Sequence, residues 1–177
     1  YFSVSTVNMD FIRAGGLDIS RLPDSMQAFV SLYAPLDGMN EKGLAVSVNM
    51  IQDSVSINQD TAKPDLTTTT AVRLLLDEAA NVEEALELLQ QYDFHSSMGM
   101  MVHLALADAE GRSVAVEYVG NEIIVTETPV VTNFYLADGE KQGIGTAQSH
   151  TRYEILIQTL EERGAMTETE VRDALDS

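Results

Sequence analysis

The sequence predicts an α+β fold built around a mainly antiparallel sheet. Strand-like segments come first, two helical segments follow, and three further strands precede two closing helices. Elements grouped in this order, with glycine-containing turns between neighbouring strands, favour antiparallel pairing over the strict alternation of a doubly wound parallel sheet. The 177 residues fit one domain, residues 1–177, that is long enough to bury a core without disulfides.

The first third of the chain predicts three strands. Residues 1–11 are rich in β-branched and aromatic side chains, and a loop or short helical turn follows at "AGGLDISRLPDS". The segment "MQAFVSLYAPL" is interpreted as a second strand that runs into Asp37-Gly38, and residues 43–51 as a third. These last two strands are predicted to form a hairpin about "DGMNEKG".

Two helices are predicted after a long polar connection from Asp53 to Thr68. In "TTAVRLLLDEAA" apolar residues recur at the spacing of one helix face. Asn81 is predicted to cap the second helix, because its side chain can accept the free N–H of Glu84 at the third helical position. The residues predicted to face inward are Val72, Leu75, Leu76 and Ala79 in the first helix and Val82, Ala85, Leu86 and Leu89 in the second.

The second half of the chain returns to strand-like alternation. "VHLALADAEGRSVAVEYVGNEIIVTETPVVTNF" predicts three strands joined by turns at Ala109-Glu110-Gly111 and Gly120-Asn121. Three strands joined by short turns form an antiparallel meander.

Two helices are predicted to close the chain. After the glycine-rich "LADGEKQGIGTAQ", Ser149 is predicted to begin a helix that Gly164 ends, and Thr167 with Glu170 forms a capping box for the last helix. The residues predicted to face inward in the longer helix are Tyr153, Leu156, Ile157 and Leu160.

Composition excludes several classes of function. The chain carries 28 acidic and 10 basic residues, a net charge of −18, which repels phosphate backbones and anionic lipid headgroups. Nucleic acids and membranes are therefore not expected partners, and no apolar run approaches the ~18 to 20 residues that cross a bilayer. The chain has no cysteine, so these residues supply no thiolate. The sequence does not determine the cellular compartment, although the cytoplasm is slightly favoured.

The familiar catalytic and metal-binding motifs are absent from the sequence. His95 and His103 are eight residues apart and match no standard zinc spacing, and no HExxH motif is present. No metal and no cofactor is therefore expected. His103 opens an apolar strand and is interpreted as a hydrogen-bonded core histidine. The patterns of α/β-hydrolases, P-loop proteins and dinucleotide-binding folds are missing as well.

Three polar residues stand where local preferences favour other types. Arg152 is the third residue after the predicted cap Ser149, where the helix dipole favours an acidic side chain. A ligand anion could offset this cost, and so could one of the many nearby carboxylates. Asn133 lies in the apolar run "PVVTNFYL", and Asn49 lies near the end of the strand predicted over residues 43–51. An asparagine amide that faces a cleft can stabilise an oxyanion, whereas one that closes a strand has no such role.

Five segments carry a family resemblance when they are taken together. They are "DGMNEKGLAVSVNM", "KPDLTTTTAVRLLLDEAANVEEALELLQQYD", "HLALADAEGRSVAVEY", "VVTNF" and "SHTRYEIL". In this order, over about residues 30–163, they resemble linear-amide hydrolases of the choloylglycine hydrolase, penicillin V acylase and acyl-CoA:6-aminopenicillanate acyltransferase group. The acyltransferase-like branch is the most similar.

The resemblance implies an N-terminal-nucleophile hydrolase with a four-layer αββα sandwich. In such enzymes the first residue of the mature chain is a cysteine, whose own α-amino group acts as the base. By position, Asn133 resembles the oxyanion-stabilising asparagine of the family, and Arg152 resembles the arginine at the start of the "SxxR" helix. Asn49 corresponds, one residue out of register, to a strand asparagine near the oxyanion hole. The implied partner is a small-molecule amide.

The sequence departs from the family where the nucleophile belongs. Residue 1 is Tyr1, no cysteine is present, and "VNMD" at residues 7–10 has a valine where the family carries arginine. We therefore expect an internal piece of a longer hydrolase or acyltransferase, a partial domain that lacks the nucleophile. The alternative is a non-catalytic domain of the same fold that binds a small ligand. A homo-oligomer that forms through exposed sheet edges is a further expectation.

Overall fold

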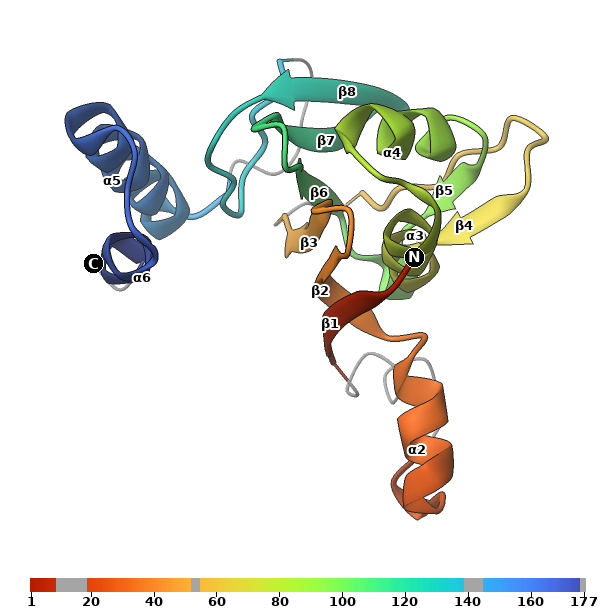
Figure 1. Ribbon diagram of the computed structural model, residues 1–177. Coiled ribbons are helices and arrows are strands. Elements are labelled where there is room, and N and C mark those ends of the chain that lie inside the picture. The colour runs from red at the N-terminus through yellow and green to blue at the C-terminus, as the bar shows by residue number, and fades with distance from the viewer. Residues whose placement is uncertain (9–18, 52–54, 139–144, 176–177) are drawn as a thin grey trace.

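The structure is a computed structural model that describes residues 1–8, 19–51, 55–138 and 145–175 (Figure 1). One sheet has six strands in the order β1-β2-β3-β6-β7-β8, and a second sheet pairs β4 with β5. The strands are β1 Ser3–Val7, β2 Pro35–Asn40, β3 Ala45–Met50, β4 Asp65–Thr67, β5 Asp93–His95, β6 Val102–Ala107, β7 Ser113–Val119 and β8 Glu122–Glu127. The helices are α2 Asp24–Ser31, α3 Thr68–Glu78, α4 Val82–Leu89, α5 Ala147–Arg163 and α6 Glu168–Leu175, with short 3-10 turns at η1 Ile19–Arg21 and η2 Ser97–Gly99.

The predicted antiparallel α+β fold is confirmed. Every neighbouring pair in the six-stranded sheet is antiparallel, and among the described strands only the short β4–β5 pair is parallel. The predicted hairpin is β2–β3, and the predicted meander is β6-β7-β8. The two helices predicted before the meander are α3 and α4, and Asn81 caps α4 by accepting the N–H of Glu84 at 2.9 Å.

The core lies between one face of the large sheet and helices α3 and α4 (Figure 1). Alternation along β3 and β6 places Val46, Leu104 and Leu106 on this face, where they pack against Val72 and Leu75 of α3. All five side chains are almost completely buried. Burial of an aliphatic side chain stabilises a fold by roughly 1.5 to 3 kcal/mol, so this interface contributes most of the driving force for folding.

Asn40 joins the β2–β3 hairpin to the end of α3. Its amide nitrogen donates to the carbonyls of Leu76 and Ala79 at 3.1 and 2.7 Å. Its amide oxygen accepts the N–H groups of Lys42 and Leu44 at 3.0 and 3.1 Å. A buried asparagine in a tight turn thus satisfies backbone groups of the turn and of the helix terminus.

The opposite face of the sheet is covered at the β6–β7 end by residues 128–137. Toward the other edge it is open, since Val4 is 81% and Met39 55% exposed. The described residues therefore contain one helical layer and one sheet layer of the four that the family resemblance implies. No helix within the described ranges is long and apolar enough to cross a bilayer.

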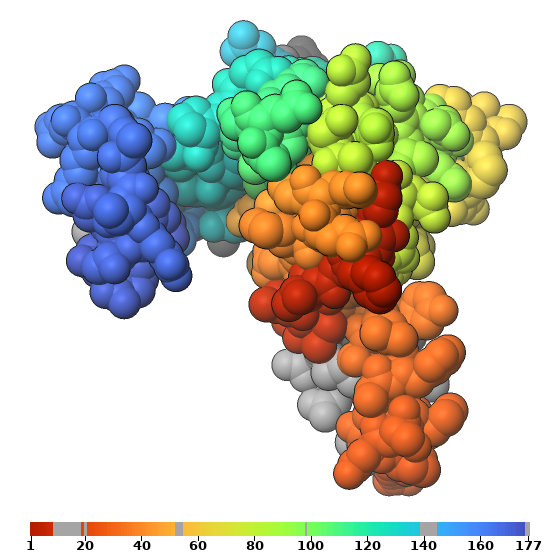
Figure 2. Space-filling model, viewed as in Figure 1, coloured from red at the N-terminus to blue at the C-terminus, as the bar shows by residue number. Residues whose placement is uncertain are grey.

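The strand predicted at "MQAFVSLYAPL" is wrong, because most of this segment forms α2. Pro23 precedes the helix and Asp24 lies in its first turn, both of which favour a helix start. Phe29 and Tyr33 are four residues apart and make an edge-to-face contact, with ring centroids 6.0 Å apart. The helix buries none of its residues and stands out from the body of the molecule (Figure 2).

Smaller elements also differ from the prediction. The polar connection 53–68 contains β4, which pairs in parallel with β5, and neither three-residue strand was predicted. The first strand is shorter than predicted, and residues 9–11 of that prediction lie outside the described residues. The four residues predicted to face inward in α5 are only half-buried. Gly164 ends α5 with a φ of +67°, and Thr167 with Glu170 caps α6, as predicted.

Tyr118 provides a test of the packing on the helical side of the sheet. Its ring stacks on Phe94 with centroids 4.9 Å apart, and burial raises the pKa of its phenol. Within the described part of the chain its hydroxyl has no hydrogen-bond partner. We therefore expect Tyr118→Phe to keep the free energy of unfolding, or to raise it by about 1 kcal/mol, in urea denaturation. Tyr118→Leu, which loses the stacking, should lower it, and a loss in the phenylalanine variant would contradict this account.

Candidate active site

A pocket of about 500 Å³ brings the three predicted site residues together. Asn49 of β3 lies on one wall, Asn133 on the segment after β8, and Arg152 on the second turn of α5. Leu156 of α5 and Leu175 of α6 close the apolar side. Residues that are more than 80 positions apart in the sequence therefore line one concavity, which joins the sheet to the C-terminal helices.

Hydrogen bonds at both ends fix the orientation of the Asn133 amide. Its nitrogen donates to the backbone carbonyl of Met50 at 2.9 Å, and its oxygen accepts from Nη2 of Arg152 at 2.9 Å. A carbonyl can only accept and a guanidinium can only donate, so these neighbours determine which end of the amide is nitrogen. Among the described residues, the second N–H of the amide has no acceptor.

The start of α5 is held against residues 132–134. The Thr132 hydroxyl donates to the carbonyl of Ser149 at 3.0 Å, and the ring of Phe134 stacks on His150 with centroids 3.9 Å apart. The same phenylalanine meets Tyr153 edge to face at 5.3 Å. These contacts position the first turns of α5, so that Arg152 lines the pocket.

Two of the local arguments for these residues are corrected by the structure. The N-cap of α5 is Thr146, whose hydroxyl accepts the N–H of Ser149 at 3.1 Å, so Ser149 is the third helical residue and not the cap. Arg152 therefore lies in the second turn, where the helix dipole has little effect. Asn133 lies in irregular chain, because β8 ends at Glu127. The hydrogen bond to Asn133, and not a dipole misfit, is what distinguishes Arg152.

A buried pair lies directly behind the pocket. His103 and Glu117 are both fully buried, and Nδ1 of the histidine is 3.1 Å from Oε1 of the glutamate. The other ring nitrogen, Nε2, lies 2.7 Å from the carbonyl oxygen of Thr132. Glu117 also accepts the backbone N–H groups of Leu136 and Ala137, at 2.9 and 2.6 Å.

The surroundings of Glu117 favour its ionised form. Burial is the largest single influence and opposes ionisation, but the hydrogen bonds from His103, Leu136 and Ala137 together outweigh it. The pKa of Glu117 therefore lies below its ordinary value. His103 is the hydrogen-bonded core histidine that the sequence predicts, and the described residues contain no cluster of three acidic or histidine side chains that could hold a metal.

Sequence reasoning missed Thr132 and Glu117. A glutamate in the apolar strand "SVAVEYV" is a signal that could have been found, because an unpaired buried carboxylate is costly and implies a partner. Thr132 gives no such signal. Its hydroxyl contacts Ser149 of α5, which is 17 positions away in the sequence.

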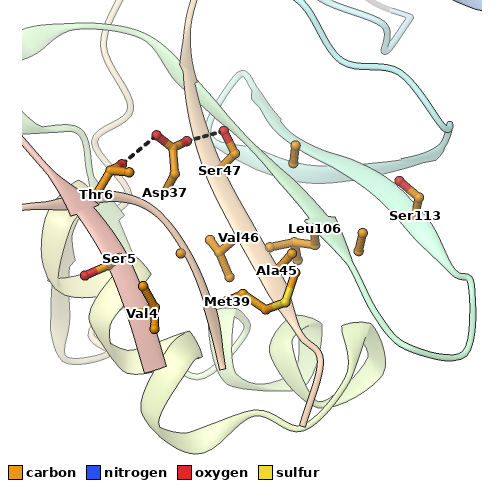
Figure 3. A pocket seen from close by; sticks show the side chains of 13 residues that line it. Val4, Ser5, Thr6, Asp37, Met39, Ala45, Val46, Ser47, Leu106 and Ser113 are labelled. Atoms are coloured by element: carbon orange, nitrogen blue, oxygen red, sulfur yellow. Dashed lines mark hydrogen bonds between the residues drawn. The ribbon is translucent and has the colours of Figure 1, made fainter. Parts of the chain in front are cut away.

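A second hollow, of about 490 Å³, lies on the open face of the sheet (Figure 3). Asp37 is its most polar feature and accepts the hydroxyls of Thr6 and Ser47. Small and apolar residues such as Ala45 and Met39 form the rest of the lining. The hollow contains none of the predicted site residues.

The fold is that of the N-terminal-nucleophile hydrolases. Two crystal structures of variants of conjugated bile acid hydrolase from Clostridium perfringens superimpose with TM-scores of 0.61 and 0.58 at 18% identity. They match 80% and 81% of this chain, which corresponds to 58% and 59% of theirs. At this identity the likeness establishes the fold alone.

The family model described as acyl-coenzyme A:6-aminopenicillanic acid acyl-transferase matches residues 27–177, and the chain belongs to this family. Penicillin V acylase of Pectobacterium atrosepticum is 31% identical over 99 residues, which are 50% of this chain and 26% of that relative. The structure of penicillin V acylase from Agrobacterium tumefaciens is 33% identical over 58% of this chain and 33% of its own, with a TM-score of 0.48. The chain thus spans about a quarter to a third of the length of these acylases.

The contact between Thr132 and α5 can be tested without an activity assay. Thr132→Val removes the hydroxyl that donates to Ser149, so we expect the free energy of unfolding to fall by about 1 kcal/mol. Amides at the start of α5 should exchange faster in hydrogen-exchange mass spectrometry. Thr128→Val is the matched control, because this buried hydroxyl donates to Val130 instead. Equal protection of α5 in both variants would show that Thr132 does not hold the helix.

Proposed function

We propose that the protein hydrolyses a linear amide, or transfers its acyl group, with a cysteine nucleophile that lies outside these 177 residues. The observation that supports this most directly is the convergence of Asn49, Asn133 and Arg152 on one pocket. Membership of the acyltransferase family and the acylase relatives supply the reaction class.

The proposed chemistry requires one residue to act as both nucleophile and base. A free α-amino group has a pKa of roughly 7.7 to 8.0, so near neutral pH it can take the proton of its own thiol. The thiolate then attacks the amide carbonyl carbon, and the carbonyl oxygen gains negative charge. Collapse of the intermediate breaks the C–N bond, and the amine leaves with the proton that the α-amino group returns. Water, or an acceptor amine in a transferase, releases the acyl group.

Asn133 is proposed to stabilise the developing oxyanion. One N–H of its amide is used by the Met50 carbonyl, and the second is available to the substrate oxygen. Arg152 holds the amide oxygen and thereby keeps the donor end in place before the substrate arrives. An oriented donor of this kind costs no reorganisation during the reaction, which is why such groups contribute strongly to rate. Asn49 is proposed to line the same oxyanion pocket.

A non-catalytic domain that binds a small amide or acyl ligand is the second candidate. The observation that favours it is the lack of any cysteine in the 177 residues. The two candidates differ at the mature N-terminus of the complete protein. Mass spectrometry that finds cysteine, serine or threonine there supports the hydrolase, and any other residue supports the binding domain.

The role of Asn133 can be measured in the complete protein. With penicillin V and a conjugated bile salt as probe substrates, Asn133→Ala should lower kcat by about 10² to 10³ for whichever substrate is cleaved, because an oxyanion donor is lost. Arg152→Lys should lower kcat less, since a donor remains without the planar guanidinium. Gln158→Ala, on the exposed side of α5, is the control and should keep wild-type activity. Wild-type kcat in Asn133→Ala would exclude the oxyanion role.

A further inference from the structure

We propose that His103 and Glu117 are positioning residues, in which a doubly protonated histidine ring bridges the buried carboxylate and the Thr132 carbonyl and so fixes Asn133 in the pocket. The catalytic part of this inference rests on the proposed function. The structural part, a charged pair that anchors residues 132–137, is independent of the proposed function.

The partners of the ring determine its protonation. The carbonyl oxygen of Thr132 can only accept, so Nε2 of His103, 2.7 Å away, donates. Glu117 already accepts two backbone N–H groups and acts as an ionised acceptor, so Nδ1 donates as well. A neutral ring would turn a lone pair toward one of these two oxygens in a fully buried place, where such a contact is strongly unfavourable. Both ring nitrogens therefore carry protons.

The pair anchors the chain on both sides of Asn133. His103 holds Thr132, one residue before it, and Glu117 holds Leu136 and Ala137, which follow it. The peptide that carries Asn133 is thus fixed at its two ends to neighbouring strands of the sheet.

The same pair reaches the other two predicted site residues. His103 is the cross-strand partner of Asn49 in the β3–β6 register, so both lie on the pocket side of the sheet. Thr132 uses its carbonyl for His103 and its hydroxyl for Ser149 of α5, the helix that carries Arg152. One buried histidine is therefore connected directly to Asn49, through Thr132 to Asn133, and through Thr132 and Ser149 to Arg152.

Stability alone is a poor explanation for this pair. Removing two charges from water carries a large desolvation cost, and a pair of apolar residues of similar volume is often as stable or more so. What a buried ion pair adds is a defined geometry, because each charged group needs partners in fixed directions. The pair lies behind the pocket, where the positions of catalytic groups must be fixed. A small displacement of a catalytic group can lower the rate by about 10²-fold.

Two isosteric variants of His103 separate positioning from general destabilisation. The amide nitrogen of asparagine occupies the place of Nδ1 and that of glutamine the place of Nε2. His103→Asn therefore keeps the contact with Glu117 and loses Thr132, whereas His103→Gln keeps Thr132 and loses Glu117. In the complete protein, with penicillin V and the bile salt as probes, we expect His103→Asn to have a kcat about tenfold below that of His103→Gln, with KM little changed.

Val116→Ala is the matched stability control. Val116 precedes Glu117 on β7, but its side chain faces the helical core, so the variant loses stability without touching the pair. If kcat in all three variants follows the loss of stability alone, the positioning role is overturned.

The structural part is measured on the complete wild-type protein by long-range ¹H–¹⁵N correlation of the histidine rings. Protons on both nitrogens of His103 at neutral pH are the expected result, and a single proton would overturn the proposal. This readout needs neither activity nor a variant that folds. If the complete wild-type protein cleaves neither probe, the proposed function fails while the ring spectrum still decides whether the buried pair is charged.

Discussion

The buried carboxylate of Glu117 is the constraint on which the pocket depends. A carboxylate without contact to water needs donors from the protein, and here they come from the His103 ring and from the backbone of Leu136 and Ala137. Satisfying this one group requires the chain beyond β8 to leave the sheet edge and cross its face. The irregular course of residues 128–137, and with it the place of Asn133, follows from that requirement.

The two walls of the pocket are held by different forces. Asn49 is paired with His103 in the β3–β6 ladder, which holds its position. The opposite wall is α5, in which Ser149 is the one buried residue among those the structure describes. Its attachment includes the Thr132 hydroxyl, the Phe134 ring and the Arg152 guanidinium. One wall is therefore set by the hydrogen-bonded sheet, and the other by side-chain contacts between α5 and residues 132–134.

The sequence allowed the sheet, α3, α4 and the meander to be predicted, because their periods and turn residues are local and agree with one another. The strand predicted over residues 26–36 was wrong, although Met26, Phe29, Val30 and Tyr33 follow helical spacing. Asn133 and Arg152 were singled out by local arguments that the structure corrects and then by the family resemblance, and their catalytic role stays a prediction. Their hydrogen bond, and the contacts of Thr132 and Glu117, join residues distant in the chain, and no local pattern encodes such pairs.

The order of strands in the large sheet also shapes how the chain reaches this structure. Neighbours in the sheet are neighbours in sequence except at β3 and β6, which are separated by residues 51–101. The strands β1-β2-β3 and β6-β7-β8 form two units, each built from strands close in sequence. Pairing β3 with β6 joins these units, and this one step carries the entropy cost of closing the long segment between them. Non-local pairing of this kind slows folding, because the long segment must be ordered before the strands gain their contacts. Asn49 and His103 face each other across that junction, so the pocket exists only once the two units have met.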